Sequence, residues 1–167
     1  MGSGTFVEKI WGLDWNEQAI QRAKVRASQE KRTNVSFAVA NVEAIEYDDP
    51  RWGKQPDIIT AHLCMSDTMI ERAGRALEKG SIFAGVSLHS NQWRETGFPS
   101  RFAFSEETIV DRLAKAGFRV DLGRVEEEVL VFESSSEAKK ILLNRLPSPF
   151  GWTLNEKRRD GLQECLD

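Results

Sequence analysis

The chain has few cysteines and no long apolar run, and these absences exclude several classes of protein. Only two cysteines, Cys64 and Cys165, occur among the 167 residues, too few for a disulfide framework or a zinc site. The apolar runs are far shorter than a membrane span, and the N-terminus lacks the charged region and apolar core of a signal peptide. We therefore expect no membrane segment, no metal site and a reducing, cytoplasmic location.

Basic clusters are scarce as well. The formal net charge is −3 and the longest basic block is residues 157–159, so the sequence does not predict nucleic-acid binding. With 40% hydrophobic and 29% charged residues, the composition is typical of a soluble globular protein. The length fits one domain covering residues 1–167.

Apolar stretches and helix-capping residues alternate along the chain. The predicted strands cover residues 11–13, 35–39, 57–61 and 81–88, with one or two more between 118 and 132. Three predicted helices follow caps at Asn16, Ser66 and Ser105. A fourth covers residues 136–146, and a fifth begins at Thr153. This alternation predicts an α/β fold with a mostly parallel sheet and helices on both faces. The core would span residues 11–132, followed by a helical extension at 136–167.

Two polar residues stand directly after predicted strands. Asp14 follows the first strand and Asn41 follows the second. In an open α/β sheet, ligands bind beyond the carboxyl ends of the strands, so both side chains would point into one crevice. Each residue also has a plainer interpretation, because Asp14 suits a surface or helix-capping acid and Asn41 suits a turn.

Five segments, taken in their order and spacing, point to a known family. They are residues 12–20 (GLDWNEQAI), 40–45 (ANVEAI), 56–62 (PDIITAH), 75–83 (RALEKGSIF) and 104–118. In this order they resemble the second strand with its helix, the end of the third strand, the fourth strand, the fifth strand with its preceding helix, and a late helix with the sixth strand of class I S-adenosylmethionine-dependent methyltransferases. The resemblance implies a Rossmann-like, doubly wound fold and methyl transfer to an unidentified small molecule.

The resemblance also implies roles for single residues. Asp14 would accept hydrogen bonds from both ribose hydroxyls of S-adenosylmethionine, since a carboxylate has the lone pairs to do so. Trp15 would lie against the adenine. Asn41, where the family usually has Asp, would face the adenine amino group, and Val42 would offer its backbone N–H to the ring.

The floor of the site near the sulfonium would be lined by Ala61 and His62. The sequence identifies no catalytic residue. Methyl transfer from a sulfonium depends mainly on positioning, so a site without an acid–base pair is still consistent with this chemistry.

The N-terminus departs from the family pattern. The family has an apolar strand that ends in Gly-x-Gly, whereas no apolar strand precedes Gly2 here. Gly2 and Gly4 would form a shortened cofactor loop, with Gly4 ten residues before Asp14 against roughly 20 in a dinucleotide fingerprint. We therefore expect an incomplete, truncated fold that lacks the central strand of the sheet.

Two alternative functions follow from the same features. The chain could be a non-catalytic methyltransferase-like module or fragment, in which unpaired strands assemble with a partner chain and give a homodimer. It could also be an NAD-dependent oxidoreductase, because Asp14 would follow the second strand of a Rossmann-like fold, where an acid suits NAD. The glycine spacing and residues 41–45 favour the methyltransferase over the oxidoreductase.

Overall fold

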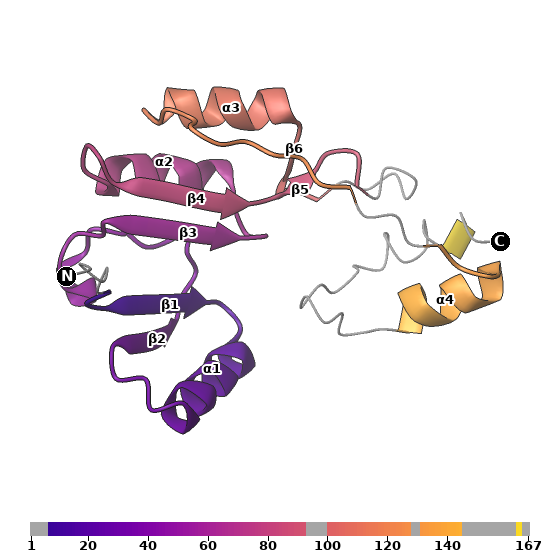
Figure 1. The fold of residues 1–167 in the computed structure, drawn as a ribbon, viewed down its shortest axis with the longest axis horizontal. Helices are drawn as coiled ribbons and strands as arrows, with labels where there is room; N and C mark the ends of the chain where they lie inside the picture. Colours follow the sequence, from indigo (N-terminus) through magenta and orange to yellow (C-terminus); the bar gives the residue numbers. More distant parts are fainter. Residues whose placement is uncertain (1–6, 93–99, 128–130, 145–162, 165–167) are drawn as a thin grey trace, which may run out of the picture. The chain divides into compact units, whose positions relative to one another are not determined.

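The computed structural model describes residues 7–92, 100–127, 131–144 and 163–164 (Figure 1). Its contacts divide the chain into two compact units. The first comprises Met1–Thr60 and Ser66–Ala84, and the second comprises Ala61–Met65 and Gly85–Asp167. The two strands β3 and β4 each begin in the first unit and end in the second.

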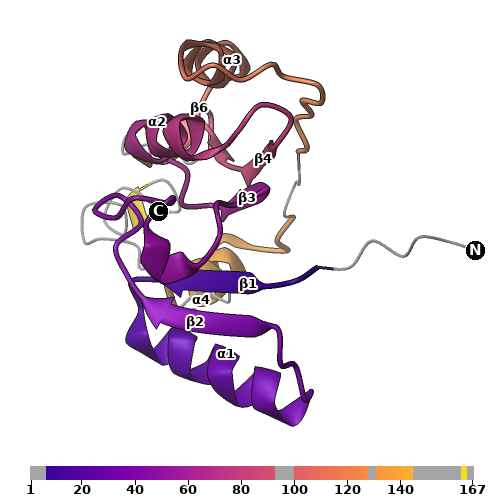
Figure 2. The same ribbon diagram turned by 90° about the vertical axis from the view of Figure 1, so that its left-hand side faces the viewer.

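The first unit begins with a parallel β-α-β element. Strand β1 (Ile10–Asp14) and strand β2 (Val35–Val39) run side by side, joined through helix α1 (Glu17–Gln29) (Figure 2). The Asn16 side chain accepts a hydrogen bond from the Ala19 N–H and so caps α1. Ile20 is the buried residue of this helix. The predicted second strand, the helix and its cap are confirmed.

Gly12 allows close contact between β1 and β2. It stands opposite Phe37 in the register of the two strands. A Cβ atom at this position would lie 2.6 Å from Cδ1 of Phe37, well inside van der Waals contact. The Phe37 ring therefore occupies the space that a side chain at Gly12 would need.

A second parallel pair is formed by β3 (Ile58–His62) and β4 (Ile82–Val86). The Asp57 carbonyl accepts a bond from the Ile82 N–H, and the Leu63 N–H donates to the Val86 carbonyl, so both strands run in the same direction. Helix α2 (Asp67–Ala76) connects them. Ser66 caps α2 as predicted. The buried residues of α2 are Met69, Ile70, Ala73 and Ala76.

The sheet is incomplete in the described part of the chain. There, β1 pairs with β2 and β3 pairs with β4, and no ladder joins the two pairs. Helices α1 and α2 each connect two parallel strands, so the predicted α/β class with a mostly parallel sheet is confirmed.

The second unit adds short elements. Strands β5 (Leu88–His89) and β6 (Ala103–Phe104) pair in parallel, and helices α3 (Glu106–Lys115) and α4 (Ser135–Asn144) follow. Ser105 caps α3 through the Thr108 N–H. Gly117 has a φ of +89°, a left-handed conformation that suits glycine just after a helix. No helix in the ranges that the structure describes is long and apolar enough to cross a membrane.

The prediction of one or two strands between residues 118 and 132 is wrong for the described part of that segment. Residues 118–127, 131 and 132 form no strand. Their charged side chains pair locally, Arg119 with Asp121 at 2.7 Å and Arg124 with Glu126 at 2.8 Å. A strand requires a neighbour to bond its backbone, and the described residues supply none here. The helix predicted from Thr153 lies outside the described residues except at 163–164, which are helical.

Candidate functional site

The two predicted polar residues, Asp14 and Asn41, lie at the carboxyl ends of the paired strands β1 and β2. Asp14 stands opposite Val39 in the register. The Ala40 N–H donates to the backbone carbonyl of Asp14 at 2.9 Å, and Asn41 is the next residue. The shared edge that the strand pattern predicted is therefore present.

Asp14 shapes the turn between β1 and α1. Its Oδ1 atom accepts a hydrogen bond from the Asn16 N–H at 2.8 Å. Its other carboxylate oxygen has no hydrogen-bond partner among the described residues. Next to it, the Trp15 side chain is 83% exposed. An acceptor oxygen and an exposed aromatic residue thus belong to consecutive positions at the strand end.

Asn41 closes a tight turn, which confirms its plainer interpretation. Its Oδ1 atom accepts from the Glu43 N–H at 3.0 Å, and its carbonyl accepts from the Ala44 N–H at 2.9 Å. The Val42 carbonyl accepts from the Tyr47 hydroxyl at 2.8 Å. The Val42 N–H has no partner within the described residues, so this donor remains available.

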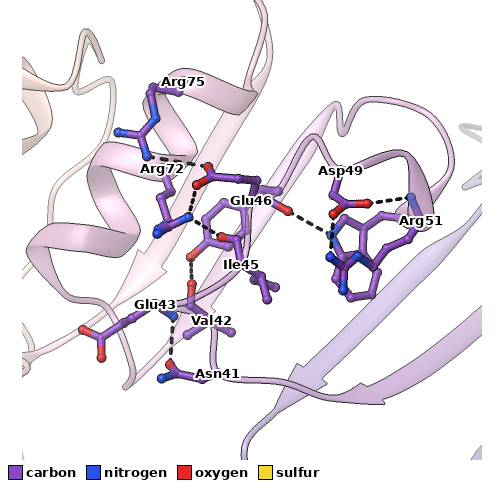
Figure 3. A network of polar contacts seen from close by, with 11 residues as sticks. Asn41, Val42, Glu43, Ile45, Glu46, Asp49, Arg51, Arg72 and Arg75 are labelled. Carbon is purple, nitrogen blue, oxygen red and sulfur yellow. Dashed lines mark hydrogen bonds and ion pairs between the residues drawn. The ribbon is translucent and has the colours of Figure 1, made fainter.

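Helix α2 holds the segment that follows this turn (Figure 3). The Arg72 guanidinium donates to the Ile45 carbonyl at 2.8 Å and pairs with the Glu46 carboxylate. Arg75 lies 3.6 Å from the same carboxylate. The side chains of Arg72 and Glu46 are 18% and 54% exposed.

The next turn fastens this loop to β1. Asp49 caps the short 3-10 helix η1 (Pro50–Trp52) through the Arg51 N–H. The hydrogen bond from the Arg51 guanidinium also lowers the pKa of the Asp49 carboxyl group, so this contact weakens only on acidification through that lowered pKa. The Trp11 indole N–H donates to the Trp52 carbonyl at 2.7 Å, and the two rings meet edge to face at 5.2 Å.

The sequence analysis missed the residues that anchor this loop. Arg72 stands 27 residues beyond Ile45 and Trp52 stands 41 residues beyond Trp11, and no local pattern links residues so far apart. Tyr47 offered one signal, because it is the only tyrosine in the chain and follows the turn closely. It is 9% exposed, with its hydroxyl on the turn.

The other predicted site residues lie in the second unit or outside the described residues. Ala61 and His62 lie at the end of β3, in the second unit, whereas Asp14 and Asn41 belong to the first. Ala61 is buried and His62 is exposed. Gly2 and Gly4 lie outside the described residues.

The β-α-β unit, with its acid at the first strand end and its turn at the second, defines a Rossmann-like α/β protein. A family model described as "Methyltransferase domain" matches residues 3–121. This chain belongs to that family. The proposed resemblance to class I methyltransferases is thereby confirmed at the level of the domain.

Solved structures support the fold. A protein from Bacillus halodurans C-125, provisionally assigned as a methyltransferase, matches this chain with a TM-score of 0.57 and 19% sequence identity. The match covers 70% of this chain and 56% of the Bacillus chain. The chain therefore spans little more than half the length of this structural relative. A comparison with curated proteins gave no significant match.

Proposed function

We propose that this domain binds S-adenosylmethionine beyond the carboxyl ends of β1 and β2 and transfers its methyl group to a small molecule. The observation that carries the proposal is the juxtaposition of Asp14 with the turn at residues 41–44, bridged by the bond from Ala40 to Asp14. Family membership favours methyl transfer over the NAD-dependent alternative.

The chemistry of the edge suits the nucleoside half of the cofactor. The open carboxylate oxygen of Asp14 would accept from a ribose hydroxyl, and the exposed Trp15 ring would cover the adenine. The Val42 N–H would donate to the adenine ring. Asn41 already accepts from Glu43, so it would meet the adenine amino group with its remaining lone pair and without charge.

When bound, the sulfonium of the cofactor supplies an activated methyl group. The chain's own contribution would be to orient the nucleoside and to limit its freedom of movement. Gly2 and Gly4 would approach the methionine end, and Ala61 and His62 the sulfonium. These four assignments rest on the resemblance alone.

Calorimetric titration tests this function directly. We expect S-adenosylhomocysteine, the demethylated product, to bind at one site per chain with a dissociation constant in the micromolar range, and NAD to give no saturable heat. The product is the better probe because it cannot react. If no heat of binding appears with millimolar S-adenosylhomocysteine, this domain does not bind the cofactor. Preferential binding of NAD would favour the oxidoreductase instead.

A second candidate function, assembly with another copy of the chain, rests on the divided sheet. Successive residues of a strand direct their backbone N–H and C=O groups to opposite sides. The Asp57 carbonyl bonds to Ile82 at the start of β4. The backbone groups of Ile58 and Thr60 therefore face the other side of β3. Within the described residues that edge has no partner strand. An open edge of this kind can pair with a strand from a second chain.

Light scattering after gel filtration distinguishes the two states. Under the assembly hypothesis, the wild-type mass is twice the 18.9 kDa of one chain. Thr60→Pro should then restore the monomer, because proline removes the amide at the open edge without touching the bonds to β4. The matched control Thr60→Val keeps the amide and should stay dimeric. A monomeric wild-type protein would rule out this function.

A further inference from the structure

Arg72 is a largely buried arginine that connects helix α2 to the loop after β2. Its guanidinium bonds to the Ile45 carbonyl and to the Glu46 carboxylate, two neighbouring groups on that loop (Figure 3). Glu46 also has Arg75 at 3.6 Å. The loop is therefore held by a side chain from a helix that lies later in the sequence.

The energetics of Arg72 favour a positioning role over a purely stabilising one. Its Nε atom is buried and has no hydrogen-bond partner among the described residues. Leaving a buried donor unpaired is unfavourable, and an ion pair with a carboxylate that is 54% exposed contributes little to stability. What this arrangement does supply is geometry, because a planar guanidinium bonded to two adjacent groups restricts where the loop can lie.

The restricted loop includes the turn proposed to meet the adenine. That turn starts at the end of β2, and the Tyr47 hydroxyl holds the Val42 carbonyl. Arg72 holds Ile45, three residues beyond Val42. The peptide that carries the Val42 N–H thus lies between β2 on one side and these two anchors on the other.

We propose that Arg72 is a positioning residue for the cofactor pocket: by holding Ile45 and Glu46 it sets the orientation of the Val42 N–H without touching the cofactor. This inference rests on the proposed function for its consequence in binding. Its structural half, the ordering of the loop by Arg72, is independent of any ligand.

Amide hydrogen exchange tests the structural half. In Arg72→Ala, the Glu43 and Ala44 amides, which bond to Asn41, should exchange about tenfold faster or more, while the amides of β1 and β2 keep their protection. Arg75→Ala is the matched control, because Arg75 is 60% exposed and pairs at 3.6 Å with the other carboxylate oxygen of Glu46, Oε2. It should leave the loop unchanged. Unchanged exchange at Glu43 and Ala44 in a folded Arg72→Ala protein would overturn the proposal.

Two milder variants keep the test decisive if Arg72→Ala does not fold. Arg72→Lys retains the charge beside Glu46 but lacks the guanidinium Nη1 atom that donates both bonds, so it should restore part of the protection. Glu46→Gln weakens the pair and leaves the bond to Ile45 in place, and it should raise exchange only slightly. Equal exchange in both variants and the wild type would contradict the ordering role.

Calorimetry with S-adenosylhomocysteine tests the consequence for binding. Arg72→Ala should weaken the affinity about tenfold, the effect of misplacing one hydrogen bond, and Arg75→Ala should change it less than about twofold. If the wild type binds no ligand, the proposed function fails while the exchange result still decides the role of Arg72. If the exchange rates rise but the affinity stays the same, Arg72 orders the loop without serving the pocket, and the proposal is wrong.

Discussion

Replacing Ile70 by alanine is expected to lower the free energy of unfolding by about 3 kcal/mol, within the range of roughly 2–5 kcal/mol for buried isoleucine-to-alanine changes. Ile70 is 1% exposed and is among the largest fully buried side chains of the described residues. It lies on the buried face of α2 with Met69 and Ala73. Truncation removes the apolar contacts of Ile70 and leaves a cavity that Ala73 is too small to fill. This cost is a large share of the total stability of about 5–15 kcal/mol of an ordinary domain.

Urea denaturation followed by circular dichroism measures this loss. The slope of the transition should stay as in the wild type, so that a lower midpoint reports stability alone. The control is Ile58→Ala on β3, which removes the same atoms from a side chain that is 58% exposed. We expect less than about 1 kcal/mol for the control. Equal losses in both variants would show that the buried face of α2 is not the core of this domain.

Replacing Asp14 by asparagine is expected to weaken the binding of S-adenosylhomocysteine about 10- to 100-fold. A hydrogen bond to a charged group contributes roughly 1.5–3 kcal/mol, and about 1.4 kcal/mol corresponds to a factor of ten. Asparagine keeps an oxygen that can accept from the Asn16 N–H, the contact that Asp14 makes at 2.8 Å. The turn into α1 should therefore survive, and the loss should fall on the ribose contact.

Calorimetry on two variants separates this contact from a general effect of charge. Glu17→Gln removes the same charge three residues later, in the first turn of α1, and should change the affinity less than about twofold. Thermal unfolding of Asp14→Asn without ligand should match that of the wild type within a few degrees. An affinity that falls equally in both variants would mean that Asp14 acts through the long-range electrostatic effect of its charge and makes no specific hydrogen bond to the ribose.

Local features of this fold were predictable because neighbouring residues decide them. Asn16, Ser66 and Ser105 each accept a bond from the N–H three residues later, and that contact needs only the local chain. The strand at residues 35–39 was predicted with its observed bounds, since its apolar residues lie between polar turns. The meeting of Asp14 and Asn41 at one edge followed from the rule for parallel strands.

The sequence by itself determined most of the helices and strands, the caps of α1, α2 and α3, and the family of this protein. Only the tertiary structure decided which segments pair and what holds the loop after β2. The expected strand between residues 118 and 132 is absent from its described part, where no neighbouring strand bonds the backbone, because strand formation depends on a partner that the local sequence does not supply. Arg72 on Ile45 and Trp11 on Trp52 join residues far apart in the chain. Such contacts follow from packing, which no local pattern encodes.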